Sequence, residues 1–311
     1  MKNYPVNFKK EHGIMFHHFH KKKKFLKSPG SINIKEFDKI LKYVGLENII
    51  SANEFYERRL KNSLKKNHVC LTFDDGLKSQ MIILEKLKKY SIKAFFFINT
   101  KYIDNNNISP ELIRYFIYVH CKGMKEFYKI FSINCNVNLK NFFKTRKNEI
   151  RRYKLKYKFY SIEDIKYRIL RNNLSVTKFN SILNKIMTLK SFNKKKILNN
   201  LYMSKKDLNR INKLGHIIGL HSHSHPMKIS KLSVKEQKKE FTINKMILQR
   251  ILADKKEINT MSYPTGDYSN KTQKILKNLN INIGFSNILS KKNKSNLDIC
   301  RVNHKYILQN L

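Results

Sequence analysis

Several residue types are scarce in this sequence of 311 residues. It has no Trp, only 5 Pro and 9 Gly, and 22 acidic residues against 65 Lys and Arg. The low Gly and Pro content excludes a collagen-like or low-complexity chain, and 20 Phe with 16 Tyr argue against disorder. The strongest apolar run, residues 94–98, is far too short to span a bilayer. The composition therefore predicts a folded protein without a membrane-spanning helix.

Cysteine is also rare, and its spacing is uninformative. Cys70, Cys121, Cys135 and Cys300 form no C-x-x-C pair, so neither a disulfide framework nor a cysteine zinc site is expected. Residues 1–20 lack the apolar core of about 7–15 residues that a signal peptide needs. We therefore expect reduced thiols and a cytoplasmic protein.

The formal net charge of +43 has two interpretations. A dense Lys and Arg surface binds nucleic acid or anionic membranes. However, the basic residues are spread along the whole chain, and Lys, Asn and Ile are all plentiful, as in proteins from A/T-rich genomes. We therefore predict no specific nucleic-acid partner, and we interpret the lysine run 21–25 as a solvated loop. Peripheral membrane contact through the basic surface stays an open alternative.

The hydrophobic pattern of the first hundred residues predicts alternating strands and helices. Strands are expected at 13–19, 68–73 and 92–99, and helices at 31–44 and 81–90. The order strand, helix, strand forms a βαβ unit, which favours a parallel sheet with its active loops at the carboxyl ends of the strands.

The same order returns after a different middle segment. Residues 101–208 are rich in Lys, Asn, Tyr and Phe at helical spacing, which predicts a mainly helical insertion within a single domain, 1–311. The pattern then predicts further helices and strands. The helices are 205–215, 232–252 and 268–280, and the strands are 216–226, 260–266, 281–287 and 299–307.

Chemically useful side chains follow three of these strands. Asp74 and Asp75 come after one strand, His221, His223 and His225 after another, and the turn 263–266 after a third. In a βα barrel these ends meet on one face. One carboxylate with two imidazoles is a sound ligand set for zinc or a similar divalent ion, and the second carboxylate is then free to act as a general base. The residues thus predict a metal-assisted hydrolase.

Three short segments resemble the ordered motifs of a known family. TFDDG, HSHSHP and YPTGDY are similar to the motifs of the polysaccharide deacetylases, also called the NodB-homology or carbohydrate esterase 4 family. The resemblance covers residues 12–100 and 205–305. It implies an α/β fold, a distorted (β/α) barrel of the NodB-homology type, here with a long helical insertion.

The resemblance assigns roles to the residues of the first two motifs. Asp74 matches the catalytic base, and Asp75, His221 and His225 match the ligands of a divalent metal ion, with Zn²⁺ expected. His223 lies at alternating spacing between the other two histidines, so on an extended backbone it would point away from them.

The third motif and its surroundings supply the other expected contacts. The backbone amide of Thr265 would hold the oxyanion, and Ser222 would orient the histidine loop. Pro264 and Tyr268 are expected to bind the substrate.

Two departures from the family pattern affect proton transfer. Many members have an arginine where this chain has Ser262, and Arg301 is a candidate to replace it. The late leucine-x-histidine motif that supplies the general acid is also missing. His304 is the late candidate for that role, and the alternatives are His17, His18 and His20.

The sequence and the resemblance together predict a deacetylase. Its expected substrate is an N-acetylated or O-acetylated carbohydrate, with a nucleotide-linked or lipid-linked precursor of a surface polysaccharide suggested by the cytoplasmic prediction. The alternative is a catalytically inactive protein of the same fold that binds anionic glycan or nucleic acid. The insertion is expected to shape or cover the substrate site.

Overall fold

The computed structural model describes residues 10–22, 24–103, 108–156, 161–252, 257–287 and 295–311. Lys23, which belongs to the predicted loop 21–25, and residues 1–9 lie outside the described residues. The chain divides into two compact units. One contains Met1–Asn105 and Asn199–Leu311, and the other contains Asn106–Leu198.

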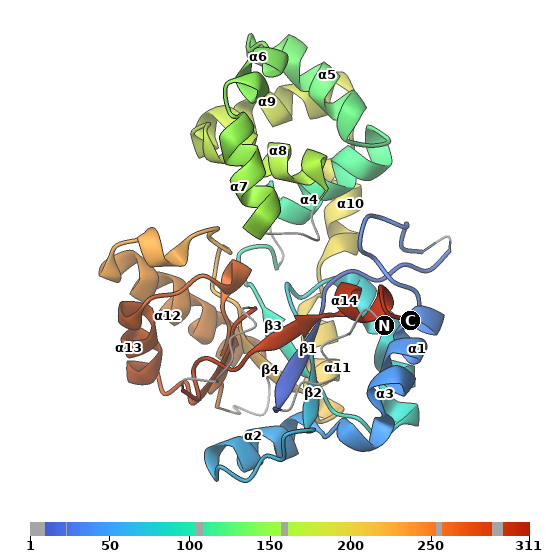
Figure 1. Ribbon diagram of the computed structural model, residues 1–311, viewed down its shortest axis with the longest axis vertical. Helices are drawn as coiled ribbons and strands as arrows, with labels where there is room; N and C mark the ends of the chain where they lie inside the picture. The colour runs from blue at the N-terminus through green and yellow to red at the C-terminus, as the bar shows by residue number, and fades with distance from the viewer. Residues whose placement is uncertain (1–9, 23, 104–107, 157–160, 253–256, 288–294) are drawn as a thin grey trace. The chain divides into compact units, whose positions relative to one another are not determined.

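The first unit is built on seven parallel strands in the order β6-β5-β4-β3-β2-β1-β7. Figure 1 labels four of them, β1, β2, β3 and β4. A parallel bridge between Phe285 and Ile299 links β6 to the residues just before β7, so the sheet forms a nearly closed barrel. This confirms the predicted distorted (β/α) barrel. The strands are β1 (His12–Phe16), β2 (Val69–Phe73), β3 (Phe95–Ile98), β4 (Ile217–Leu220), β5 (Thr260–Ser262), β6 (Ile283–Phe285) and β7 (Arg301–Asn303).

Both faces of the strands are buried, as expected for a parallel sheet covered by helices. Phe95 and Phe97 of β3 pack inside the barrel with Ile283 and Phe285 of β6. The alternate residues, such as Phe96, pack in the larger outer core against the surrounding helices. Side-chain alternation therefore separates a core inside the barrel from a larger core between the strands and the helices.

Helices with recognisable caps follow most strands. Asn33 and Glu36 form a capping box at the start of α1, and Ser233 and Glu236 form another at the start of α12. The α-helices of this unit are α1 (Ile34–Val44), α2 (Ala52–Leu60), α3 (Leu84–Lys89), α11 (Lys205–Lys213), α12 (Val234–Ile251), α13 (Asn270–Asn278) and α14 (His304–Leu308). Its 3₁₀ turns are η2 (Leu46–Asn48), η3 (Lys78–Ile83), η5 (Ile229–Lys231) and η6 (Pro264–Gly266).

The last predicted strand, 299–307, is wrong in its second half. The strand ends at Asn303, whose side chain accepts a hydrogen bond from the backbone N–H of Lys305 at 3.0 Å. This N-cap begins α14, so His304 lies in a helix.

The second unit is helical among its described residues, with an aromatic core that includes Phe116, Phe127, Phe131 and Phe179. No described helix of either unit has the length and apolarity that crossing a membrane requires. The helices are α4 (Pro110–Tyr115), the π-helix η4 (Phe116–His120), α5 (Met124–Cys135), α6 (Leu139–Lys144), α7 (Lys147–Lys156), α8 (Ile162–Asn172), α9 (Val176–Leu189) and α10 (Lys194–Leu201), which contains the boundary between the units.

Candidate active site

Unusual backbone conformations mark the loops that follow β2, β4 and β5. Asp75, Ser222, His225 and Thr265 all have φ between 55° and 73°, in the left-handed region that non-glycine residues seldom adopt. Such conformations persist where the surrounding structure enforces them, and they cluster at functional sites. Each of the three loops therefore holds at least one non-glycine residue in a strained backbone conformation.

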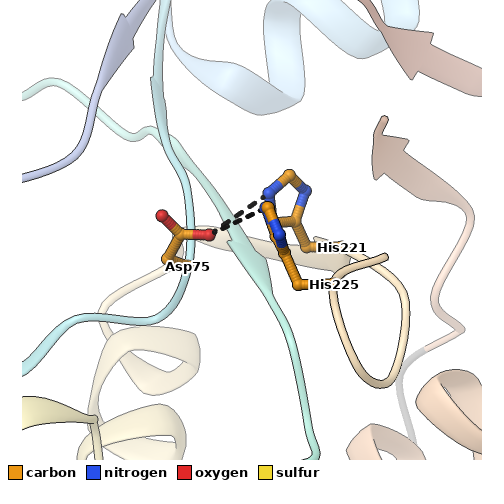
Figure 2. A group of neighbouring side chains, drawn as sticks. All are labelled: Asp75, His221 and His225. Atoms are coloured by element: carbon orange, nitrogen blue, oxygen red, sulfur yellow. Dashed lines mark ion pairs between the residues drawn. The ribbon is translucent and has the colours of Figure 1, made fainter. Parts of the chain in front are cut away.

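Asp75, His221 and His225 converge at this end of the barrel (Figure 2). The Oδ1 atom of Asp75 lies 3.4 Å from Nε2 of each histidine, and one ligand atom from each residue falls within 4.8 Å of the others. His221 donates its Nδ1–H to the carbonyl of Ser262 at 2.8 Å, which leaves Nε2 as the unprotonated atom in the neutral ring.

These donors fit a divalent ion. Two imidazole nitrogens and one carboxylate oxygen match the ligand set of catalytic zinc sites, which leave a coordination position open. Burial raises the pKa of Asp75, but the neighbouring His221 and His225 lower it more, so the carboxyl is held ionised. Burial lowers the pKa of His221, while Asp74 and Asp75 raise it above its ordinary value. The carboxylates therefore set up a negative site that favours a cation.

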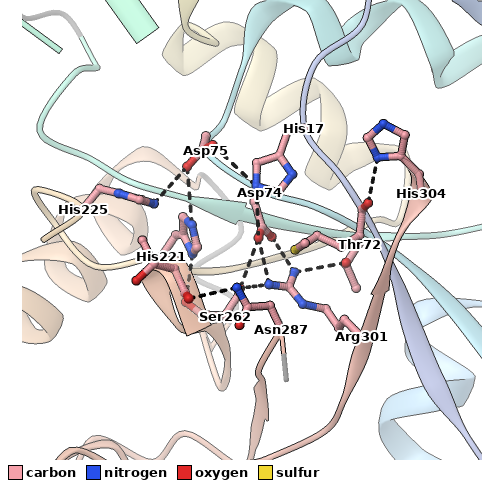
Figure 3. Close-up of polar contacts among 12 residues, drawn as sticks. His17, Thr72, Asp74, Asp75, His221, His225, Ser262, Asn287, Arg301 and His304 are labelled. Atoms are coloured by element: carbon pink, nitrogen blue, oxygen red, sulfur yellow. Dashed lines mark hydrogen bonds and ion pairs between the residues drawn. The ribbon is translucent and has the colours of Figure 1, made fainter. Parts of the chain in front are cut away.

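Asp74 forms a buried ion pair with Arg301 of β7 (Figure 3). The two Nη atoms donate to the two carboxylate oxygens at 2.7 and 2.9 Å, and Nη2 also donates to Oγ of Ser262 at 2.7 Å. Gly13 makes room for this arginine, because a Cβ atom there would lie 3.0 Å from its Cγ. Arg301 thus pairs with Asp74, and the small Ser262 leaves room for its guanidinium beside the carboxylate.

The arginine sets the charge state of Asp74. Burial alone would raise the pKa of Asp74, but the guanidinium of Arg301 lowers it below its ordinary value. The carboxylate is therefore ionised at neutral pH and able to accept a proton.

His17 is the histidine that faces the two aspartates. Its Nε2 lies 3.9 Å from an oxygen of Asp74 and 3.9 Å from an oxygen of Asp75. Burial is the main cause that lowers the pKa of His17 to about 4, against the opposing effect of the two carboxylates. The ring follows β1 and is neutral at pH 7. Its neighbour His18 stacks on it, whereas His20 Nδ1 contacts Oγ of Ser31.

His304 does not face the carboxylates. Its Nδ1 lies 3.1 Å from the carbonyl oxygen of Met15 and its Nε2 lies 3.2 Å from that of Gly30, while the ring stacks on Phe16. Burial lowers the pKa of His304 to about 3. These contacts do not support the predicted role as general acid, because the helix that begins at this residue turns the ring into the core.

The third motif forms a tight turn. Thr265 donates its hydroxyl to the carbonyl of Met227 at 2.9 Å, and its own carbonyl accepts from Nδ2 of Asn287 at 2.9 Å. Pro264 is buried. Tyr268 stacks on the buried Tyr263 with ring centroids 4.4 Å apart. The structure thus fixes the turn firmly, and it packs the ring of Tyr268 against protein.

The histidine loop is held from outside the barrel by α12. Ser224 donates its N–H and its hydroxyl to the carboxylate of Glu240, at 2.7 and 2.6 Å. Asn244 accepts the backbone N–H of His221 at 3.0 Å. His223 points to Oγ1 of Thr100 at 3.0 Å and is not part of the cluster. Neither Glu240 nor Asn244 could be recognised from the sequence, because polar residues on a predicted helix are usually solvated.

Comparison with solved structures identifies proteins of the same fold. The chain is similar to the deacetylase PplD of Streptococcus pyogenes, in complex with acetate (18% identity, 96% of this chain and 97% of that chain, TM-score 0.54). It is also similar to IcaB from Ammonifex degensii (14%, 94% and 91%, 0.56) and to a de-N-acetylase from Aggregatibacter actinomycetemcomitans (13%, 96% and 98%, 0.55). At these identities the likeness shows the fold.

The sequence itself carries the family assignment. No curated protein sequence matches the chain. The family model for polysaccharide deacetylase matches residues 61–123 and 150–284, which is more than half of the chain. The chain belongs to the polysaccharide deacetylase family.

Proposed function

We propose that the protein is a metal-dependent hydrolase that removes the acetyl group from an N-acetylated sugar, or from an O-acetylated one. One observation carries the proposal. The three convergent ligands, Asp75, His221 and His225, lie beside an ionised Asp74 that is paired with Arg301. A ligand set and a separate base at one barrel mouth are what hydrolysis of an acyl bond requires.

The residues have distinct roles in the attack. A divalent ion, with zinc favoured by the donors, would lower the pKa of a water molecule and polarise the acyl oxygen. Asp74 takes a proton from the water as its oxygen forms a bond to the acyl carbon. The backbone N–H of Thr265 is assigned to stabilise the developing oxyanion.

The second step breaks the carbon–nitrogen bond. The electron pair of that bond moves to the nitrogen, which takes the proton that Asp74 removed from the water. His17 is neutral at pH 7 and lies near Asp74, so we assign it to pass this proton to the departing nitrogen. One water and one acetamide thus give one acetate and one amine.

The charge of the chain supports a phosphate-bearing substrate. A net charge of +43 attracts anions from solution. We therefore propose a nucleotide-linked or lipid-linked acetylated sugar as the substrate, a cytoplasmic site of action, and peripheral contact with an anionic membrane. A comparison of acetate release from a nucleotide-linked N-acetylhexosamine and from an uncharged N-acetylglucosamine oligomer tests the substrate class.

Acetate release with matched variants tests the activity itself. The purified protein, supplied with Zn²⁺, is expected to release acetate, and Asp74→Asn is expected to lose at least about 1,000-fold in kcat while it still binds zinc, because only the base is removed. His225→Ala is expected to lose zinc, and His223→Ala to keep it. Wild-type protein that binds no divalent ion and releases no acetate from either substrate would point to the non-catalytic binder of anionic glycan.

A further inference from the structure

A buried side-chain amide near the site has an unpaired atom. Asn99 follows β3 and is 3% exposed, and its Oδ1 has no hydrogen-bond partner among the described residues. Buried polar atoms in native proteins are nearly always paired, because an unpaired acceptor loses its hydrogen bonds to water and gains none in the protein. The unpaired oxygen therefore indicates a partner that binds from outside the chain.

The amide points into the barrel. The next residue, Thr100, has its hydroxyl 3.1 Å from Nδ2 of Asn244, which belongs to α12 outside the barrel. The preceding alternate residues, Phe95 and Phe97, pack in the barrel interior. Because successive side chains of an extended chain point to opposite faces, Asn99 lies on the inner side, one layer above Phe97.

The neighbouring strands carry the metal ligands and the base. β3 lies between β2 and β4 in the sheet. Ile98 is paired with Leu220, so Asn99 is level with His221. Thr72 is paired with Phe95, so Asp74 is level with Phe97. Asn99 thus stands at the barrel mouth between the strand that ends in the two aspartates and the strand that ends in a histidine ligand.

The layer below the amide is already filled. The guanidinium carbon of Arg301 lies 6.0 Å from the centroid of the Phe97 ring, and the same guanidinium binds Asp74. No donor among the described residues forms a hydrogen bond with Oδ1 of Asn99. The unpaired oxygen of Asn99 therefore lies above this filled layer, at the barrel mouth, where water and substrate would meet the carboxylates.

We propose that Asn99 is a further catalytic residue, whose Oδ1 accepts a hydrogen bond from the attacking water. The inference rests on the proposed hydrolysis. A water molecule has two protons, and Asp74 accepts one of them. A second acceptor on the opposite side fixes the other proton, so that the lone pair of the water is aimed at the acyl carbon.

A stability measurement tests this without any turnover. In Asn99→Leu a similar volume replaces the amide, and an unpaired buried acceptor is removed. The melting temperature of the metal-free protein is expected to stay unchanged or to rise by about 2 °C. Asn244→Leu is the matched control, because its amide is paired with His221, Ile98 and Thr100. The melting temperature of this control is expected to fall.

Kinetics with an amide substrate and an ester substrate identify which group donates a hydrogen bond to Oδ1 of Asn99. Asn99→Leu is expected to lose on the order of 100-fold in kcat, with little change in KM, on both an N-acetylated and an O-acetylated sugar. An ester has no N–H, so a loss confined to the N-acetylated substrate would overturn the assignment to water in favour of the substrate amide.

The two measurements keep this inference separate from the proposed function. A melting temperature that falls as far in Asn99→Leu as in Asn244→Leu would show a structural amide and overturn the inference, whether or not the enzyme is active. An active wild type with an equally active Asn99→Leu would overturn the inference and leave the deacetylase intact. A wild type without acetate release would reject the proposed function itself.

Discussion

A single pair of residues sets the base at the barrel mouth. Asp74 and Arg301 are almost fully buried, and two hydrogen bonds join them. A buried charge that loses its partner is strongly destabilising, by about 3–5 kcal/mol, because it stays desolvated. The pair therefore links the folding of the barrel to the ionisation of Asp74, the carboxylate that we propose as the base.

Replacement of Arg301 is expected to move the pH profile of the reaction. The arginine lowers the pKa of Asp74, so Arg301→Met raises that pKa, and the acidic limb of kcat/KM shifts to higher pH. Arg301→Lys keeps a charge without the two parallel bonds and should shift less. A pH series of acetate release measures both variants.

Arg59→Met provides the control for this experiment. It removes another arginine that pairs with a carboxylate, that of Glu11 at 2.8 Å, away from the three loops. Its acidic limb should coincide with that of the wild type. A profile of Arg301→Met that also coincides with it would show that the arginine only stabilises the fold.

At the scale of the elements, α12 holds the histidine loop. Glu240 accepts two hydrogen bonds from Ser224, which lies just before the ligand His225. Partners that orient metal ligands are worth about 10–100-fold in affinity. Glu240→Ala is therefore expected to weaken zinc binding by that factor in competition with a chelator, while Lys239→Ala, an exposed change one residue earlier, leaves it unaltered. Equal affinities in the two variants would contradict a role for the helix.

The buried His216, which lies just before β4, is expected to make the stability of the protein depend on pH. His216 is buried, its Nδ1 accepts the N–H of Ala94 at 3.0 Å, and burial lowers the pKa of His216 to about 4. Between about pH 6.5 and 4, His216 is protonated in the unfolded chain but stays neutral in the native protein. The unfolding free energy is therefore expected to fall as the pH falls, by up to about 1.4 kcal/mol per unit from this group.

His216→Asn isolates that contribution. The amide oxygen can still accept the N–H of Ala94 but does not titrate. Urea unfolding at a series of pH values should give a shallower dependence for the variant in this window. Parallel curves for the two proteins would mean that the ring is protonated in the native state as well.

The elements differ in how well the sequence predicts them. The end of β2 was predicted because the apolar run stops at Asp74, whereas the strand predicted at 216–226 ends at Leu220 in the structure. The helix α2 was missed, since only Ala52 and Phe55 of its residues are buried and its apolar pattern is weak. The alternation of Phe95, Phe97 and Asn99 was a usable signal for the inward amide. Its missing partner was visible only in the structure.

The sequence made Arg301 a candidate partner of Asp74, but only the structure shows the pair. The two residues are 227 positions apart, and they meet because β7 pairs with β1 on the side opposite β2. An arginine in an apolar run predicts only that its charge needs some partner. Likewise, the sequence did not indicate that α14 begins at His304, where the strand 299–307 was predicted to continue.

At the scale of the whole molecule, charge opposes compactness. The formal net charge is +43 on 311 residues, so the Lys and Arg side chains repel one another, and this repulsion is greatest at low ionic strength. Sodium chloride shortens the Debye length to about 8 Å at 0.15 M. The melting temperature is therefore expected to rise between about 0.01 and 0.15 M salt and then to level off. A melting temperature that is flat across this range would show that the charges are already compensated.

The position of β7 near the end of the chain has a consequence for the order of the folding steps. Contacts within the helical unit close loops no longer than Asn106–Leu198, whereas the contact between β7 and β1 closes a loop of nearly the whole chain, and such closures are slow. Arg301 arrives with that strand. We expect the carboxylate of Asp74 to gain its cation only when the barrel shuts, so that a chain still emerging from the ribosome has helices and zinc ligands but no competent base.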